Sequence, residues 1–188
     1  MNAEEFFKKK IDEVKVFRSA LSTETDRGCA LFASSYLDKA LSDLLYCALA
    51  YDKKIENDLF EGTAPLAAFS ARIKMAFYLG KISKVERRDL DLIRKIRNEF
   101  AHNADAIDFE EEKIKNQCRE LSFSYHDNDH RPRGHFTAAC MGLLVNIHNE
   151  TLLSQAPEIK AENAPSEEKK QMIRERIQKL ADETDNNA

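Results

Sequence analysis

Residues that break helices are scarce in this chain, and their scarcity limits the folds that it can adopt. Only five glycines and four prolines occur among 188 residues, so few tight turns can be specified. Apolar side chains recur every three or four residues over most of the length, which is the spacing of a buried helical face. Runs of alternating apolar and polar residues, which would indicate strands, do not occur. The sequence therefore predicts a small number of long helices.

Local signals mark where several of these helices begin. Thr25 or Thr23 can cap the most apolar helix, because a threonine hydroxyl can accept a hydrogen bond from the first free amides. Ser83 followed by Glu86 has the spacing of a capping box. The predicted helices span residues 3–20, 25–51, 65–80, 83–103, 108–121, 136–156 and 166–181, and the predicted connectors span residues 52–65, 122–135 and 157–166.

Together these segments predict an all-α fold: a single helical bundle of about five core helices with a charged C-terminal helix. Pro65 suits the first turn of the helix expected over 65–80, and Gly80 suits its C-terminal end. Two of the other three prolines, Pro157 and Pro165, lie in the last connector, which reads as a linker. We therefore divide the chain into a helical bundle over residues 1–156 and a linker with a helical tail over residues 157–188.

Charge and composition narrow the class of partner. The formal net charge is −4 and the isoelectric point is about 5.8, whereas proteins that hold nucleic acid by overall charge are basic. No P-loop, GxGxxG turn or helix-turn-helix with a basic recognition helix is present, so we expect no sequence-specific DNA reading by the chain alone. The first ten residues lack the apolar region of a signal peptide, and no apolar run reaches the ~18 residues of a membrane span. We expect a cytoplasmic protein without a membrane contact or a cofactor.

Cysteines and histidines do not form the pattern of a metal site. The four cysteines are far apart and contain no CxxC pair, so buried, reduced thiols are the expected state. His126, His130 and His135 lie together in a polar connector, but no cysteine is close enough in sequence to complete a tetrahedral zinc site. We predict a solvated loop and no metal there. The alternative is that these histidines contact phosphates together with Arg131 and Arg133.

Polar residues gather near the end of the helix expected over 83–103. Arg94 and Asn98 are four residues apart, as are Asn98 and His102, so each pair shares a helical face, and Arg97 lies about 100° away from Asn98. Asn98 can then hydrogen-bond His102 and set its tautomer. Arginine with a positioned histidine is sufficient for metal-free RNA cleavage, because histidine moves protons near neutral pH and arginine stabilises phosphate charge. A histidine at a helix end with a purely structural role has the same spacing.

The same helix carries the strongest basic patch outside the tail. Seven cationic residues against three acidic ones lie between positions 81 and 97, a local excess of four positive charges. Both a solvated helix face and a binding surface are compatible with this pattern. The candidate binding residues are Arg72, Lys74, Arg87, Arg88 and Arg94, although Arg72 also fits an ion pair between helices.

About half of the chain, over residues 26–115, carries a likeness to a known family in three stretches: "DRGCALFASSYLDKALSDLLYCAL" (26–49), "LFEGTAPLAAFSARIKMAFYLGKIS" (59–83) and "DLDLIRKIRNEFAHN" (89–103). These stretches resemble the mannitol operon repressor (MltR-like) family. The most telling part runs from Gly62 to Gly80: a glycine, then Pro-Leu, Ser-x-Arg-hydrophobic-Lys and Leu-Gly. The resemblance implies a helical, cytoplasmic regulator of sugar-alcohol uptake that lacks its own DNA-reading module and represses through a partner.

A second, shorter stretch, "RNEFAH" (97–102), resembles the Arg-x4-His signature of HEPN domains. Those domains are helical bundles that dimerise so that two such motifs face each other. Many are metal-independent ribonucleases of toxin–antitoxin or phage-defence systems, and others are inactive binding modules. The resemblance implies that Arg97 and His102 are a catalytic pair at a dimer interface and that Asn98 supports them.

These observations leave three functions in competition. The leading hypothesis is an MltR-like transcriptional regulator or co-regulator without enzymatic activity, which acts as a homodimer through contacts with a protein partner. The alternative is a HEPN-like ribonuclease with an RNA substrate, in which Arg97, Asn98 and His102 form the catalytic site. A third hypothesis is a structural partner in a toxin or defence complex.

Overall fold

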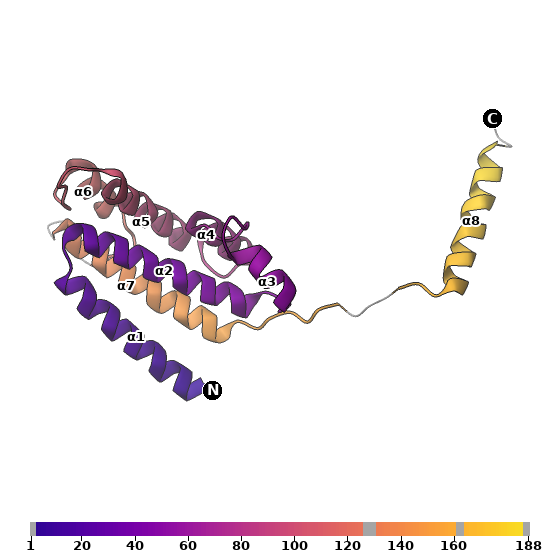
Figure 1. The fold of residues 1–188 in the computed structure, drawn as a ribbon, viewed down its shortest axis with the longest axis horizontal. Coiled ribbons are helices and arrows are strands. Elements are labelled where there is room, and N and C mark those ends of the chain that lie inside the picture. Colours follow the sequence, from indigo (N-terminus) through magenta and orange to yellow (C-terminus); the bar gives the residue numbers. More distant parts are fainter. Residues whose placement is uncertain (1–2, 126–130, 161–163, 186–188) are drawn as a thin grey trace. The chain divides into compact units, whose positions relative to one another are not determined.

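A computed structural model of the chain describes residues 3–125, 131–160 and 164–185 (Figure 1). In this described part the chain forms eight helices and no strand, which confirms the predicted all-α fold. The helices are α1 (Ala3–Thr23), α2 (Asp26–Ala48), α3 (Lys53–Phe60), α4 (Phe69–Tyr78), α5 (Lys84–His102), α6 (Glu112–Arg119), α7 (Pro132–Leu153) and α8 (Glu167–Asp185).

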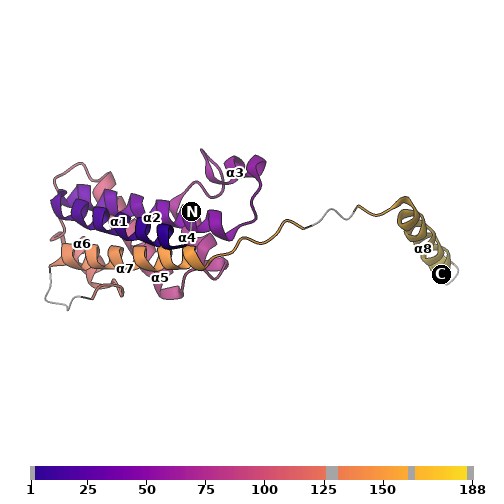
Figure 2. The same ribbon diagram turned by 90° about the horizontal axis from the view of Figure 1, so that it is seen from below.

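Helices α2 and α7 form the centre of the bundle and lie side by side over most of their length (Figures 1 and 2). Helix α1 packs along both of them, and α4 and α5 pack against α2. Helix α6 is placed between α5 and α7. The helix predicted over residues 25–51 is the most apolar one, and its central position explains this, because α2 contacts α1, α4, α5 and α7.

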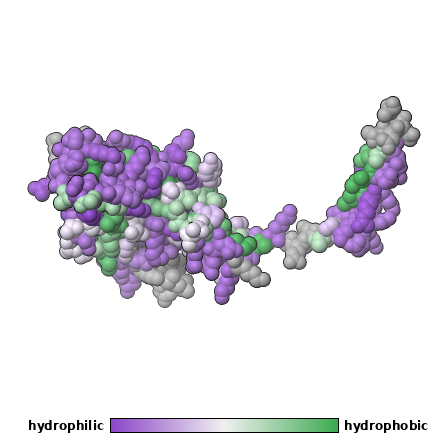
Figure 3. All heavy atoms as spheres, turned by 45° about the horizontal axis from the view of Figure 1, so that its top comes forward, coloured by the Kyte–Doolittle hydropathy of each residue, from purple (hydrophilic) through white to green (hydrophobic). Residues whose placement is uncertain are grey.

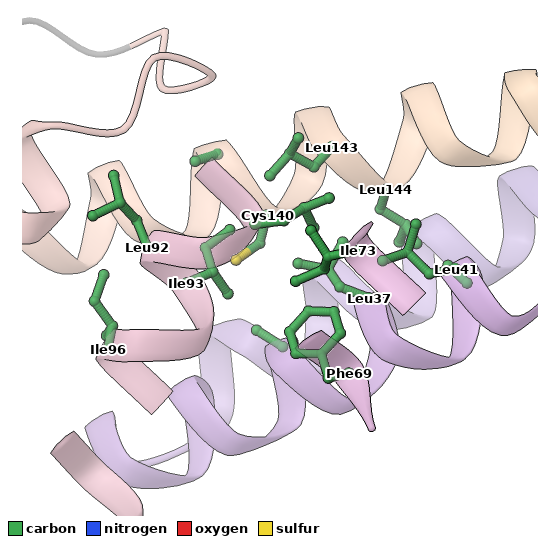
Figure 4. Packing of buried hydrophobic residues seen from close by; sticks show 14 of the residues in the cluster. Leu37, Leu41, Phe69, Ile73, Leu92, Ile93, Ile96, Cys140, Leu143 and Leu144 are labelled. Atoms are coloured by element: carbon green, nitrogen blue, oxygen red, sulfur yellow. The ribbon is translucent and has the colours of Figure 1, made fainter. Parts of the chain in front are cut away.

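The apolar core lies where α2, α4, α5 and α7 meet (Figure 4). Leu37 and Leu41 of α2, Ile73 of α4, Ile93 of α5 and Leu144 of α7 are fully buried there. Their side chains come from four helices and converge in one cluster, as Figure 4 shows. Burial of large aliphatic side chains is the main stabilising contribution in a bundle of this kind.

Three phenylalanines extend this core toward α6. Phe100 of α5 and Phe109, in the segment before α6, have ring centroids 5.0 Å apart. Phe109 and Phe136 of α7 have ring centroids 5.1 Å apart. All three are at most 1% exposed. The phenylalanine row therefore joins the end of α5 to the start of α7.

The predicted caps of α2 and α5 are confirmed. The Thr25 hydroxyl accepts a hydrogen bond from the Gly28 amide at 3.1 Å. Ser83 and Glu86 form the full capping box, because the Glu86 amide donates to Ser83 Oγ at 3.2 Å and the Ser83 amide donates to Glu86 Oε2 at 2.7 Å. Gly80 has a φ of +69°, which glycine adopts without strain, and it follows α4 as predicted.

The prediction between α2 and α4 is wrong in two respects. The connector expected over 52–65 contains the short helix α3, and α4 begins at Phe69. Pro65 does not lie in a first helical turn, because the amide of the next residue, Leu66, donates to the Leu59 carbonyl oxygen at 2.8 Å and closes a turn. Leu66 is 4% exposed, so this turn is held by burial of its apolar residue.

Two other helices begin at residues that differ from the prediction. The Asp108 carboxylate accepts a hydrogen bond from the Glu110 amide at 2.9 Å, which makes a local turn, and α6 begins only at Glu112. Helix α7 begins at Pro132 rather than at residue 136, because proline fits the first helical position.

Contacts divide the chain into two units, Met1–Pro157 and Glu158–Ala188. The second unit contains α8, a charged helix whose four large apolar side chains are 46–62% exposed. Figure 3 shows apolar residues along one side of this helix. These apolar residues are Met172, Ile173, Ile177 and Leu180. Across the described ranges, none of the helices has the length and the apolar character that crossing a bilayer would require.

Candidate functional site

The polar residues that the sequence singles out lie on the last turns of α5. Arg97 and Asn98 are half-buried, and His102, the final residue of the helix, is exposed. Within the described part of the chain, none of the three side chains has a hydrogen-bond or ion-pair partner. The predicted hydrogen bond between Asn98 and His102 is therefore not formed. These residues form an open polar surface and do not hold two helices together.

The end of α5 is nevertheless fixed in position. Arg27 of α2 donates hydrogen bonds to the carbonyl oxygens of Asn103 and Asp105, at 2.9 and 2.7 Å. Lys113 lies 2.7 Å from the Glu99 carboxylate, which links α6 to the same end of α5. Carbonyl groups at the end of a helix have no partner inside the helix. The Arg27 guanidinium provides a partner for the carbonyl groups of Asn103 and Asp105, which follow α5.

Two of the five candidate binding residues are half-buried and lie near a carboxylate of the bundle. Arg72 Nη1 lies 2.6 Å from Asp38 Oδ1, which joins α4 to α2, and the Arg72 side chain is 13% exposed. Arg94 Nε lies 3.5 Å from Asp91 Oδ1 on the same helix. The partner that sequence reasoning could not name for Arg72 is thus Asp38.

The other three candidates are exposed. Arg88 lies 3.3 Å from the Glu120 carboxylate, and about half of each side chain remains accessible. Lys74 has no partner among the described residues. Arg87 lies over the Phe77 ring with its guanidinium carbon 4.9 Å from the ring centroid, a cation–π geometry.

Exposed apolar side chains lie next to Arg87, at the corner where α4 ends and α5 begins. Tyr78 is 86% exposed, Leu79 is 38% exposed and Val85 is 47% exposed. Exposed aromatic and apolar residues next to arginine are typical of protein-binding surfaces. We call this surface the corner patch, and it consists of Tyr78, Leu79, Lys84, Val85, Arg87 and Arg88.

Sequence reasoning missed the apolar half of the corner patch. It assigned residues 65–80 to one amphipathic helix, but Phe77, Tyr78 and Leu79 are consecutive and cannot share one face. Three consecutive apolar residues at the end of a helix indicate that at least one of them is exposed, and this pattern could have predicted the exposed side chains of the patch. The structure places Phe77 partly against the core and leaves Tyr78 in solvent.

Polar contacts with α7 hold the corner in place. Lys81 Nζ lies 3.1 Å from Glu150 Oε1, and Asn146 Nδ2 donates to Glu86 Oε1 at 3.2 Å. Ile82, which lies between Lys81 and Glu86 in the sequence, is 5% exposed. The corner patch is therefore preorganised, which lowers the entropy lost when a partner binds.

A buried carboxyl group lies on the inner side of α5. Asp89 is fully buried, and its Oδ2 accepts a hydrogen bond from the Phe123 amide at 2.9 Å. Its other oxygen has no hydrogen-bond partner among the described residues. Burial raises the pKa of this carboxyl above its ordinary value, while the hydrogen bond from Phe123 opposes the shift.

This shift predicts the pH dependence of the Asp89→Asn variant. A carboxyl whose pKa is raised by folding binds protons more tightly in the folded state, so it stabilises the wild type as the pH falls through that pKa. We expect the free energy of unfolding of the wild type, measured relative to Asp89→Asn, to rise as the pH falls from 7 toward the ordinary aspartate range, with a slope of at most about 1.4 kcal/mol per pH unit. Urea unfolding at a series of pH values measures it, and a difference that is independent of pH would contradict the assignment.

The remaining ionisable candidates form no site in the described structure. Burial raises the pKa of the Cys29 thiol to about 11 and that of Cys118 to about 12, so both stay protonated at neutral pH. His135 lies in α7 rather than in a loop, and its Nδ1 is 2.9 Å from Ser124 Oγ. His126 and His130 lie outside the described residues. No three metal-ligating side chains converge within the described ranges.

Comparison with known proteins adds two matches. The family model described as "MtlR: Mannitol repressor" matches residues 33–180, which extends well beyond the predicted likeness and includes most of α8. Among solved structures, a chain in the X-ray structure of the MtlR–HPr complex from Escherichia coli is similar with a TM-score of 0.60 and 20% sequence identity. The match covers 71% of this chain and 96% of that chain, and it shows a shared fold. No curated protein matches the sequence.

Proposed function

The chain belongs to the mannitol repressor (MtlR) family, and from this membership we propose that it is a transcriptional regulator or co-regulator that acts by binding another protein. The observation that carries the proposal is the family match, which covers the larger part of the bundle and most of α8. The solved chain that shares the fold is part of a complex with HPr. We therefore propose an HPr-type protein as the partner of this chain.

The corner patch is the surface that best suits such a partner. It joins exposed Tyr78, Leu79 and Val85 to three cationic side chains, and tyrosine and arginine contribute most strongly to protein interfaces. Two carboxylates lie beside the patch: that of Glu120 is 3.3 Å from Arg88, and that of Glu86 is bonded to Asn146 and to the Ser83 amide. We propose that the partner presents an apolar surface with acidic residues at its edge.

The wider regulatory proposal follows from the same reasoning. The net charge is −4, and the strongest basic patch outside the tail, around α5, has an excess of only four positive charges, which is small for a protein that holds DNA through its own charge. We propose that effects on transcription arise through the bound protein rather than through sequence-specific DNA reading. A cytoplasmic location and a homodimeric state stay predictions.

Substitution of the corner patch provides the test. We expect the double variant Tyr78→Ala/Arg87→Ala to bind HPr from the same organism at least about tenfold more weakly than the wild type, because it removes the aromatic and cationic centre of the patch. Isothermal titration calorimetry of the full-length chain with purified HPr measures this affinity. Circular dichroism of the variant checks that the bundle is folded.

The matched control is Tyr51→Ala, which removes another exposed tyrosine, 65% accessible, that is not part of the corner patch. We expect this variant to bind as the wild type does. If the wild type itself does not bind HPr, the proposed partner is wrong. If both variants bind with wild-type affinity, the partner is retained and the corner patch is wrong.

Neither comparison supports the ribonuclease alternative. Arg97, Asn98 and His102 share the end of α5, but the structure shows no bond between them and describes a single copy of the chain. The catalytic roles of these residues, and an RNA substrate, stay predictions. Their partly exposed position on the basic stretch of α5 is equally compatible with a second contact area for a protein partner.

A further inference from the structure

A second surface feature lies at the other end of the bundle from the corner patch, between the end of α1 and the start of α7. A pocket of about 440 Å³ opens there. Three arginines line it: Arg18 of α1, Arg131 just before α7, and Arg133 in the first turn of α7. No aspartate or glutamate lines the pocket. Its volume lies in the range of small-molecule sites.

The pocket exists because α7 presents short side chains where helices normally interlock. Gly134, Thr137 and Ala138 lie three or four residues apart, so they share the face of α7 that lines the pocket. Opposite them, α1 contributes Ser22 to the lining. Helix packing usually fills such a space with larger side chains.

The three arginines differ in what they bind. Arg133 Nη1 lies 2.6 Å from Asp26 Oδ1, and Nη2 donates to the Leu21 carbonyl oxygen at 2.8 Å. Arg133 therefore holds the wall of the pocket in place, and its ion pair neutralises the nearby carboxylate of Asp26. Arg18 and Arg131 are exposed, and their guanidinium groups have no partner among the described residues. Two guanidinium groups without partners, from positions far apart in the sequence, therefore lie at one pocket.

The hydroxyl groups at the pocket have free acceptor positions. Ser22 Oγ donates to the Arg18 carbonyl oxygen at 3.0 Å, and Thr137 Oγ1 donates to the Gly134 carbonyl oxygen at 3.1 Å. Because each hydroxyl uses its single proton in this bond, its oxygen lone pairs can accept hydrogen bonds from a ligand. Leu21, which also lines the pocket, is 3% exposed and adds an apolar wall.

We propose that this pocket binds a small organic phosphate that carries hydroxyl groups. Arg18 and Arg131 hold the phosphate, since the guanidinium group matches phosphate oxygens in pairs. Ser22 and Thr137 accept hydrogen bonds from the hydroxyl groups of the ligand, and the apolar wall contacts its carbon skeleton. Free inorganic phosphate could make the contacts with Arg18 and Arg131, but it has no sugar hydroxyl groups or carbon skeleton for the other contacts.

Calorimetric titration of the full-length chain tests the proposal with defined probes. The probes are a panel of hexose, pentose and hexitol phosphates, the same sugars without phosphate, and inorganic phosphate. We expect at least one sugar or hexitol phosphate to bind at least about tenfold more tightly than either its unphosphorylated form or inorganic phosphate. Arg18→Gln and Arg131→Gln should each weaken that binding at least about tenfold.

Arg119→Gln is the matched control, because Arg119 is an exposed arginine at the end of α6 that does not line the pocket. It should bind like the wild type. The proposal is overturned if no member of the panel binds, if inorganic phosphate binds as tightly as the esters, or if Arg119→Gln weakens binding as much as Arg18→Gln. Amide shifts of Gly134 and Thr137 in NMR spectra locate the ligand, and shifts confined to other helices also overturn it.

Discussion

Replacing Phe136 by alanine is expected to lower the free energy of unfolding by about 3–5 kcal/mol. The Phe136 side chain is fully buried and packs on Phe109, which in turn packs on Phe100. Truncation removes the apolar contact and leaves a cavity between α5 and α7 that a tightly packed interior fills only in part. The loss should be large because the ring is fully buried in a row that links the end of α5 to the start of α7.

Urea unfolding followed by circular dichroism measures this loss. The control is again Tyr51→Ala, which removes an exposed ring and should change the free energy of unfolding by less than about 0.5 kcal/mol. A loss below about 1 kcal/mol for Phe136→Ala would mean that α7 closes the cavity by moving. In that case the phenylalanine row would not hold the start of α7.

Replacing Arg72 by alanine should be the second most damaging change, with an expected loss of about 2–3 kcal/mol. The Arg72–Asp38 pair joins α4 to α2, and the two side chains are 13% and 28% exposed. Removal of one partner leaves the other charge partly buried without compensation. We expect less than the loss found for fully buried pairs, because water still reaches Asp38.

A double-mutant cycle separates this structural role from ligand binding. Arg72→Ala and Asp38→Ala should each destabilise the protein, and the double variant should lose less than the sum, with a coupling of about 1–2 kcal/mol. The exposed pair Lys15–Asp12, with side chains 70% and 58% accessible, should couple by less than about 0.5 kcal/mol. A coupling near zero for Arg72 and Asp38 would instead leave Arg72 available for a ligand.

Local sequence signals predicted the elements that depend on local interactions. The apolar faces of α2, α5 and α7, the Thr25 cap and the Ser83 capping box each follow from residues within a few positions of one another. Helix α3 and the start of α6 were missed, because burial of Leu66 and the turn at Asp108 decide them. Those features arise from tertiary packing and from a side chain that competes with helix formation.

Surface chemistry was harder to predict than the fold. The sequence placed Arg97, Asn98 and His102 on one helix, yet it could not show that they lack partners. It also could not bring Arg18 next to Arg131, because more than a hundred residues separate them in the chain. The spacing of residues along one helix can be read from a sequence, whereas contacts between helices can be identified only once the packing of the helices is known.

The segment that joins α7 to α8 has a consequence for how strongly a partner is held. It comprises residues 154–166, so its ends can lie at most about 45 Å apart. A protein already bound to the bundle therefore meets α8 as an attached molecule, at an effective concentration in the millimolar range if the geometry allows both contacts. Under that condition, even a weak contact of the exposed Ile173 and Ile177 side chains with the bound protein would lengthen the lifetime of the complex considerably.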